Sequence, residues 1–436
     1  MPGVPSSRGC SACRKQKKKA SSRICDQAKP TCGRCTSRGI PCVGNGVQRW
    51  KFHQKNFRDS MQVATVTHTP RPSLSNETTK VASSFVHILG VEDVRYNIRS
   101  FGGQFFLDLP RRVGSSPALD LSVSALVASF NTHLCKHPKV DALAVYGDAL
   151  EALRISLANP AQSIGIKIYT IFNIYICQGI IDPEHNEIAT HRLMLANLVQ
   201  DAVSQGRLKE IDSEYMSGIC QIILWESMIN RKVQLGQWFW EALSTCSKSR
   251  PHECQQGRTF MSLDIGVQAE GASYLREPER YIDQIQSVYD LMQLERPTIR
   301  NIVQQYSVVA MASSNVAKVT EIRVIYQIGY AHLLSLGARL NGALRKFNQS
   351  SELIKESHDI RDEAIMLASQ CGDMRPFGST FVPKFLKIIW ASNSDPYRRQ
   401  ELEALILYYQ KDFEGALYLK EAKWIKERFN AIAKGA

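Results

Sequence analysis

Residues 10–42 read CSACRKQKKKASSRICDQAKPTCGRCTSRGIPC, and this stretch decides how the rest of the chain is interpreted. It contains half of the chain's 12 cysteines, together with many Lys and Arg residues and a single acid, Asp26. Its cysteines are Cys10, Cys13, Cys25, Cys32, Cys35 and Cys42. Their spacing is a Cys-x2-Cys-x6-Cys unit used twice, with extra residues in the last interval of the first copy.

The two Cys-x2-Cys corners are typical of zinc sites. Zinc prefers about four ligands in a tetrahedron, so two ions need about eight coordination positions. Six cysteines supply them if two thiolates bridge both ions, and the remaining charge of about −2 can be offset by the surrounding Lys and Arg side chains. The residues therefore predict a cluster of two Zn2+ ions per chain.

Two other interpretations use the same cysteines. A disulfide framework is disfavoured because the N-terminus, MPGVPSSRGC, has no apolar secretion segment and the cationic run is typical of a reducing compartment. The second interpretation is a single zinc bound at the two corners, with Cys25 and Cys42 left as spectators. A measurement of zinc per chain distinguishes this single-ion site from the two-ion cluster.

The stretch resembles the fungal Zn2Cys6 binuclear-cluster transcription factors in its cysteine spacing, its basic first interval and Pro30 in the loop. The resemblance implies that the chain regulates RNA polymerase II genes by binding specific sites in double-stranded DNA. It also implies the ligand set. Two cysteines would bridge both ions, Cys10 and Cys32, and each ion would have two more ligands, Cys13 and Cys25 for one ion and Cys35 and Cys42 for the other.

The same resemblance implies that the basic segment after Cys13 forms a short helix in the major groove. Family members place the third and fourth residues after the second cysteine against the bases, here Gln16 and Lys17, and commonly read CGG triplets. The other expected DNA contacts are with phosphate, from Arg14, Lys15, Lys18 and Lys19.

The first unit departs from the family spacing by a stretch that begins at Ala20 and ends at Ile24. Closing the longer loop costs only about 0.5 kcal/mol, whereas a structural zinc site is worth on the order of 10 kcal/mol. An alternative function remains open: if this stretch disables the finger, the chain is a non-DNA-binding interaction or effector-sensing protein.

The charge of the chain is concentrated at one end. The formal net charge is +13, and residues 1–60 contribute all but one unit of it. This polarity fits a nucleic-acid contact at the N-terminus, and the Lys15–Lys19 run is also typical of nuclear localisation. Because no stretch of about 18 consecutive apolar residues occurs, we expect no membrane span.

We expect three regions in the chain. Residues 1–48 form the DNA-binding domain, residues 49–84 a disordered basic and Ser/Thr/Pro-rich linker, and residues 85–436 a large all-α domain. The last region resembles the helical regulatory domain of fungal factors in the stretches SPALDLSVSALVASFNTH, YGDALEALRISLANP and GALYLKEAKWIKERF. That resemblance implies contacts with partners such as the transcription machinery. Because residues 43–90 lack a heptad pattern, both a monomer and a homodimer through the helical domain are compatible with the sequence.

Helical periodicity predicts most of the second region. One helix between Pro138 and Pro160 should bury a single stripe of residues, namely Val140, Leu143, Gly147, Leu150, Leu153 and Leu157. The other predicted helices span 117–134, 162–178, 186–204, 214–231, 278–293, 298–311, 320–346, 351–370, 396–410 and 413–433.

The sequence contains no motif typical of an enzyme. We find no Gly-x-Ser-x-Gly elbow, no phosphate-binding Gly-x4-Gly-Lys-Ser/Thr loop and no His-Glu-x2-His. The aromatic run Trp238–Trp240 is interpreted as core. We therefore expect a regulator and no catalytic activity.

Overall fold

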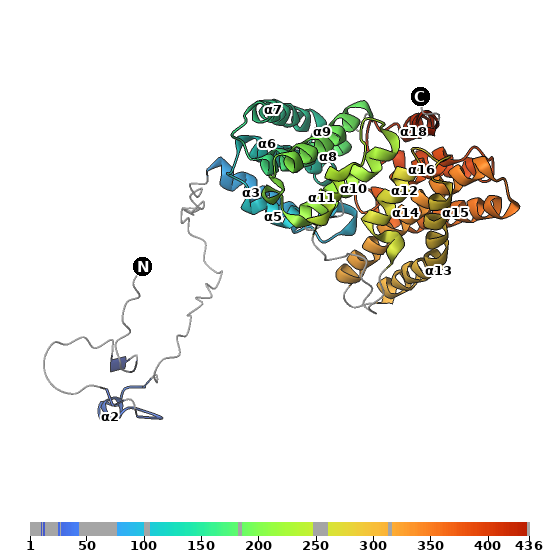
Figure 1. Ribbon diagram of the computed structural model, residues 1–436. Helices are drawn as coiled ribbons and strands as arrows, with labels where there is room; N and C mark the ends of the chain where they lie inside the picture. Colours follow the sequence, from blue (N-terminus) through green and yellow to red (C-terminus); the bar gives the residue numbers. More distant parts are fainter. Residues whose placement is uncertain are drawn as a thin grey trace. The chain divides into compact units, whose positions relative to one another are not determined.

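The computed structural model describes residues 10, 12–13, 25–26, 28–42, 76–99, 105–181, 185–246, 260–312 and 316–433 (Figure 1). The described part of the chain is helical and contains no strand, as the sequence predicted. The chain divides into two compact units, residues 1–71 and residues 72–436, and each is described by itself. The described part of the first unit holds the six clustered cysteines and the short helix α2 (Gly33–Thr36).

The described part of the second unit is built from α-helices. In chain order they are α3 (Glu77–Leu89), α5 (Phe105–Asp108), α6 (Pro117–Leu134), α7 (Lys139–Ala158), α8 (Ile164–Ile181), α9 (His185–Ser204), α10 (Ser213–Ile229), α11 (Gln237–Ser244), α12 (Ile265–Tyr274), α13 (Ile282–Ala312), α14 (Val316–Phe347), α15 (Ser351–Gln370), α16 (Phe381–Ser392), α17 (Arg399–Gln410) and α18 (Tyr418–Ala433). Short 3-10 helices lie between them at Val94–Tyr96, Leu109–Arg111, Leu208–Glu210, Met261–Leu263 and Gly372–Met374.

Helices that follow one another in the sequence pack side by side in this unit (Figure 1). In its first half, α6 contacts α7 and α8, and α8 contacts α9. In its second half, α14 contacts α13, α15 and α16, and α16 contacts α18. The last helix also returns to α10, so the end of the chain contributes to the middle of the core.

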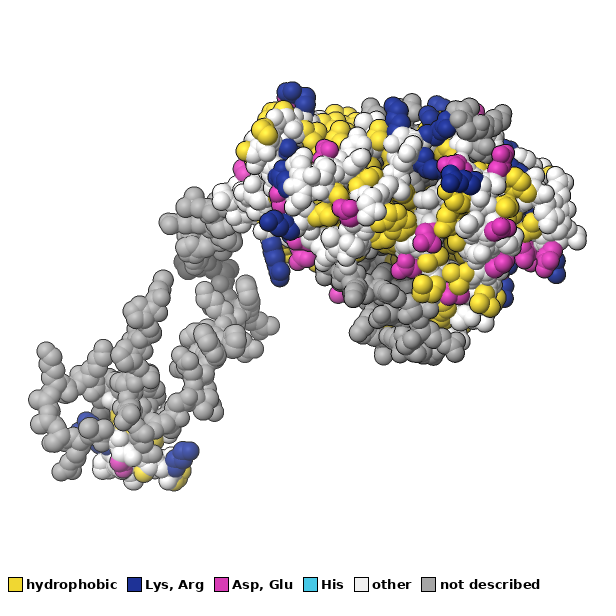
Figure 2. Space-filling view, in the orientation of Figure 1, with side chains coloured by type: hydrophobic (Ala, Val, Ile, Leu, Met, Phe, Trp, Pro, Cys, Tyr) yellow, Lys and Arg dark blue, Asp and Glu magenta, His cyan; other side chains and the backbone are white. Residues whose placement is uncertain are grey.

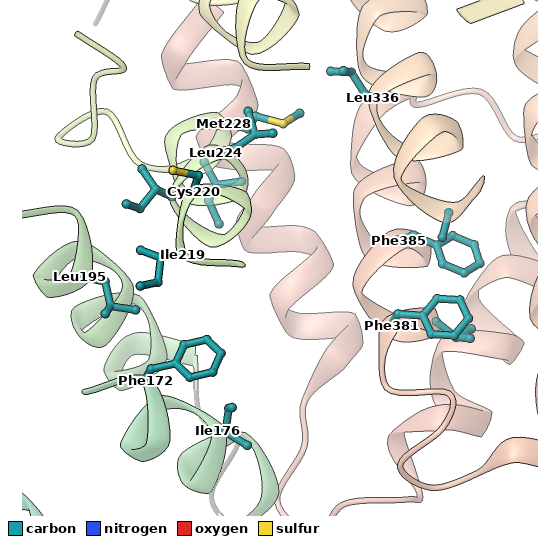
Figure 3. Packing of buried hydrophobic residues seen from close by; sticks show 14 of the residues in the cluster. Phe172, Ile176, Leu195, Ile219, Cys220, Leu224, Met228, Leu336, Phe381 and Phe385 are labelled. Atoms are coloured by element: carbon teal, nitrogen blue, oxygen red, sulfur yellow. The ribbon is translucent and has the colours of Figure 1, made fainter. Parts of the chain in front are cut away.

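Helix α8 is a core helix. By length and composition it could cross a membrane, but 83 % of it is buried inside the second unit. Its side chains Phe172 and Ile176 lie in the apolar cluster with Leu195 of α9 and Ile219 of α10 (Figure 3). Burial on all sides explains why α8 has apolar residues around its whole circumference.

The surface of the second unit mixes charges of both signs. On the face shown in Figure 2, Lys and Arg side chains lie among Asp and Glu side chains. Many form ion pairs, such as Arg375 with Asp412 at 2.6 Å and Arg398 with Asp362 at 2.8 Å. This pairing agrees with the near-neutral composition of the chain after residue 60.

Several predicted helices differ from those observed. Helix α6 and helix α15 have the predicted bounds, but α13 is continuous across Pro297, where the sequence predicted two helices. Helix α13 packs along α14, and this packing stabilises the helix across Pro297, which cannot donate a backbone hydrogen bond. Helices α11, α12 and α16 were missed. Helix α3 begins at Glu77, inside the predicted linker, where the Asn76 side chain accepts a hydrogen bond from the Thr79 N–H at 2.8 Å.

The predicted buried face of α7 is correct only in its C-terminal half, where Leu153 is buried and Leu150 and Leu157 are partly buried against the core. Val140 is 73 % exposed, and Leu143 is also exposed. The residues that α7 buries are Ala142, Tyr146, Ala149, Leu153 and Ser156. Both sets follow helical spacing, and α6 packs against the face that carries the small alanines, which allow close approach of the two helices.

The Trp238–Trp240 run belongs to the core, as predicted. Phe239 is fully buried, and Trp238 and Trp240 are partly buried against the same cluster. Their rings contact the Phe239 ring edge to face, at centroid distances of 6.0 and 5.6 Å.

Candidate metal centre

The second Cys-x2-Cys corner is a short helical turn. Cys32 has an extended backbone, and its carbonyl accepts hydrogen bonds from the N–H groups of Cys35 at 2.9 Å and Thr36 at 3.1 Å. This turn brings the third residue after Cys32 back to the same side of the chain. The Cys32 and Cys35 side chains can therefore face one site.

Asp26 fixes the start of this turn from the other half of the first unit. Both of its carboxylate oxygens lie 3.0 Å from the Gly33 nitrogen and accept its N–H. A Cβ atom at Gly33 would lie 2.9 Å from Asp26 Oδ2, so a glycine at this position permits the close approach. Sequence reasoning missed this role, because a carboxylate separated from the helix by several residues does not follow the local N-cap pattern.

A left-handed residue after α2 returns the chain to the cluster. Gly39 has φ of 61°, a conformation that suits glycine. The next residue, Ile40, donates its N–H to the Cys35 carbonyl at 3.1 Å. The chain thereby returns to the cluster, where Cys42 is the last cysteine.

The six cysteines converge as two groups of four sulfur atoms. One group is Cys10, Cys13, Cys25 and Cys32, and the other is Cys10, Cys32, Cys35 and Cys42. Within each group all Sγ atoms lie within 4.8 Å of one another, and Cys10 and Cys32 belong to both. Cys25 and Cys42 are group members, which argues against the single-zinc interpretation that left them as spectators.

The distances between the sulfur atoms fit metal coordination. Cys10 Sγ lies 3.7 Å from Cys32 Sγ and 3.7 Å from Cys35 Sγ, and Cys13 Sγ lies 3.9 Å from Cys32 Sγ. A zinc tetrahedron with Zn–S bonds of about 2.3 Å has sulfur atoms about 3.8 Å apart. A disulfide needs about 2.05 Å, and all six cysteines are free thiols. The donor set therefore fits two zinc ions.

Backbone N–H groups point at the sulfur atoms in the same way in both Cys-x2-Cys-x6-Cys repeats. In each repeat, the N–H of the first cysteine donates to the sulfur of the third cysteine. Cys10 N–H donates to Cys25 Sγ and Cys32 N–H to Cys42 Sγ, both at 3.4 Å. The contact has the same length in the first repeat, with its longer interval, as in the second repeat. In addition, the Cys13 N–H donates to Cys10 Sγ at 3.4 Å. Such bonds orient ligands and stabilise thiolate charge.

Thiols held this closely cannot all ionise without a compensating cation. The Cys13 backbone N–H lowers the pKa of Cys10 to about 6, whereas the side-chain hydrogen bond with Cys10 raises the pKa of Cys13 to about 12. The side-chain hydrogen bond with Cys32 likewise raises the pKa of Cys35. Divalent cations would stabilise the thiolate form of all six, with release of protons.

The predicted DNA-binding segment, Arg14–Lys19, lies outside the described residues. The described cations of the first unit are Lys29, Arg34 and Arg38, of which Lys29 and Arg38 are exposed. Sequence reasoning did not assign these three to DNA. Their position beside the cysteines adds to the positive charge around the cluster.

Comparison with known proteins identifies the first unit. Residues 8–51 match the family described as the Fungal Zn(2)-Cys(6) binuclear cluster domain. Domains of this family bind two zinc ions and belong to fungal DNA-binding transcription regulators, which are not enzymes. Searches of curated proteins and of solved structures returned no match. The resemblance of the second region to a fungal regulatory domain therefore stays a prediction.

Proposed function

We propose that this chain regulates transcription by RNA polymerase II by binding specific sites in double-stranded DNA. One observation carries the proposal: inside the matched range of residues 8–51, six thiols form two groups of four that share Cys10 and Cys32. The concentration of positive charge in residues 1–60 supports a nucleic-acid partner. The family match favours this function over the non-DNA-binding alternative.

In this proposal all six clustered cysteines are zinc ligands. Cys10 and Cys32 bridge the ions, Cys13 and Cys25 complete one site, and Cys35 and Cys42 complete the other. Bound zinc cross-links the two Cys-x2-Cys-x6-Cys repeats of the first unit and neutralises thiolate charge. The protein's own groups hold the arrangement, because Asp26 caps α2 and the Cys10 and Cys32 N–H groups orient the Cys25 and Cys42 sulfurs.

The basic segment is the proposed DNA-reading element. Residues 12 and 13 are helical and directly precede Arg14, which supports a helix in this segment. A helix continuing from there can enter the major groove with Gln16 and Lys17 against base edges. The phosphate contacts in this proposal come from Arg14, Lys15, Lys18 and Lys19.

The second unit is proposed to be regulatory. Its helices would contact the transcription machinery, or a second copy of the chain as a homodimer, and the Lys15–Lys19 run would direct the protein to the nucleus. We keep the proposed domain limits at residues 1–48, 49–84 and 85–436, and α3 (Glu77–Leu89) crosses the limit between the last two.

Selection from a random pool of duplex DNA tests the proposed function. The full zinc-loaded chain and a chain lacking residues 20–24 should both enrich a common sequence, and metal-free protein should enrich none. Enrichment by the shortened chain alone would instead support an interaction protein whose finger is disabled.

A further inference from the structure

Two adjoining hollows follow one side of α13 on the second unit. The first has a volume of about 290 Å³ and lies between α13 and α15. The second, of about 440 Å³, continues along α13, and Asn301 and Gln304 line both. Sites for small organic molecules commonly have volumes of about 300 to 1,000 Å³. The two hollows together are called the α13 groove below, and the proposed DNA contact does not use it.

The first hollow has an arginine-rich end. Arg300 of α13 lines it, and its Nη1 donates to Glu363 Oε1 of α15 at 2.9 Å. Arg296, four residues earlier in α13, contacts the other oxygen of the same carboxylate through Nε at 3.5 Å. The hydroxyl of Tyr330 on α14 donates to that second oxygen as well. Two guanidinium groups thus share one buried carboxylate, which already has a third donor.

The two arginines keep hydrogen-bonding capacity for a further anion. Within the described part of the chain, Arg300 donates to Glu363 alone, and its side chain is 37 % exposed. Nη1 of Arg296 is buried and has no hydrogen-bond partner among the described residues. A guanidinium group has five N–H donors in a planar fork that matches a carboxylate. This end of the groove therefore favours a ligand with a carboxylate group.

The second acid in the lining of the first hollow is already neutralised. Asp362 Oδ1 accepts a hydrogen bond from Arg398 Nη1 at 2.8 Å, and its Oδ2 accepts one from the Tyr397 hydroxyl at 3.1 Å. Arg398 also pairs with Glu401, which lies outside the lining of both hollows. Repulsion of a ligand carboxylate by Asp362 is weakened accordingly.

The far end of the groove is apolar. Val308 and Val309 line the second hollow and are 68 % and 47 % exposed. Arg300, Asn301, Gln304 and Val308 follow one another at helical spacing along the same side of α13. The eight residues from Arg300 to Val308 span about 12 Å of helix. A ligand that reaches both ends therefore has an anionic head and an apolar chain of similar length.

We propose that the α13 groove binds a medium-chain fatty acid, with its carboxylate on Arg300 and its hydrocarbon chain directed toward Val308 and Val309. The head forms charge-assisted hydrogen bonds with the guanidinium group. Met366 of α15, which lines the first hollow, supplies an adaptable apolar contact beside the head. The chain covers the two exposed valines, and removal of both apolar surfaces from water favours binding. The second unit thereby gains a ligand that the proposed function does not require.

Calorimetric titration of the full zinc-loaded chain with octanoic acid tests the proposal. We expect saturable binding of one octanoate per chain. Octanol, which has the chain without the charge, should bind about tenfold more weakly or less, and so should acetate, which has the charge without the chain. The proposal is overturned if octanoate shows no saturable binding at up to about 1 mM, or if octanol or acetate binds as tightly as octanoate does. These comparisons use the unmodified chain, so they do not depend on the folding of any variant.

Two matched pairs of variants locate the site. Arg300→Gln should weaken octanoate binding about tenfold, whereas Arg154→Gln, the same change at another arginine paired with a glutamate, should leave it unchanged. Val308→Ser should weaken binding about threefold, and Val140→Ser, at another exposed helical valine, should have no effect. Circular dichroism checks that all four variants fold.

An affinity for octanoate that is unchanged in Arg300→Gln or in Val308→Ser overturns the proposal, because the fatty acid then binds elsewhere. Val308 is a surface residue, so its variant provides this test even if the change at Arg300 disturbs folding. None of these measurements involves DNA, so this site and the proposed function fail separately.

Discussion

The sulfur atoms of Cys10 and Cys32 lie 3.7 Å apart, and each belongs to both groups of four thiols in the first unit. These cysteines begin the two Cys-x2-Cys corners and are 22 residues apart in the sequence. A metal ion in either group would therefore bind both halves of the unit. The first unit consequently depends on its two metal sites together.

Replacing a cysteine that belongs to both groups should release more zinc than replacing a cysteine that belongs to only one group. We expect Cys32→Ala to lose both zinc ions and Cys42→Ala to lose one, because only the first change takes a ligand from both sites. Native mass spectrometry of the full chain counts the ions. A Cys32→Ala protein that retains one ion as firmly as Cys42→Ala does would contradict the sharing of Cys32.

Loss of the Asp26 side chain should weaken the cluster without abolishing it. Asp26→Ala leaves the Gly33 N–H uncapped, which costs about 1 kcal/mol, or about fivefold in zinc affinity. Asp26→Asn keeps an acceptor oxygen and should lose less. Competition with a chelator measures both variants, and equal affinities for Asp26→Ala and the unmodified chain would show that the contact is not stabilising.

The proposed base-reading role of Lys17 predicts a specific loss of DNA affinity. Lys17→Ala should weaken binding to a selected DNA site by roughly 1 to 3 kcal/mol. Lys411, an exposed lysine of the second unit, supplies a control with the same change in net charge, and Lys411→Ala should bind normally. A titration monitored by fluorescence anisotropy compares them. Identical curves for all three proteins would count against the major-groove proposal.

Two helical glycines should respond oppositely to alanine. A Cβ at Gly165 of α8 would lie 2.2 Å from the Glu210 carbonyl oxygen, whereas one at Gly147 of α7 meets nothing within 4 Å. Gly165→Ala should destabilise the second unit by about 1 to 3 kcal/mol, and Gly147→Ala should stabilise it by about 0.5 to 1 kcal/mol. Urea unfolding followed by helical circular dichroism measures both. A neutral Gly165→Ala would show that the approach of α8 to Glu210 is looser than described.

Partly buried His133 should make the second unit sensitive to acid. Burial beside Phe377 and Phe413 lowers the pKa of His133 below its ordinary value of 6.5. The unfolded chain therefore takes up a proton first as the pH falls, and stability present above about pH 6.5 is lost below it. His133→Phe should flatten the decline in thermal midpoint between about pH 7 and 5.

His137→Phe, the same change at an exposed position, is the control for this effect. His191 remains buried with a lowered pKa, so the slope in His133→Phe should decrease without vanishing. A slope unchanged from that of the unmodified chain would mean that His133 is protonated in the folded state.

The sequence predicted the first unit better than the second, for physical reasons. Cysteine spacing encodes metal sites directly, because ligand number and geometry are set by zinc. Helix α6 begins at a proline and was predicted with its observed bounds, whereas α16, which carries Pro383 in its first turn and buries most of its residues, was missed. The contact of Asp26 with Gly33 joins separate segments of the first unit, which local patterns do not reveal.

The number of zinc ions per full-length chain tests the central claim most directly. Native mass spectrometry after equilibration with zinc should find two ions bound to each chain, with six thiols protected from alkylation until a chelator removes the metal. A chain that binds one ion and leaves Cys25 and Cys42 open to alkylation, or a chain that binds none, would contradict the account.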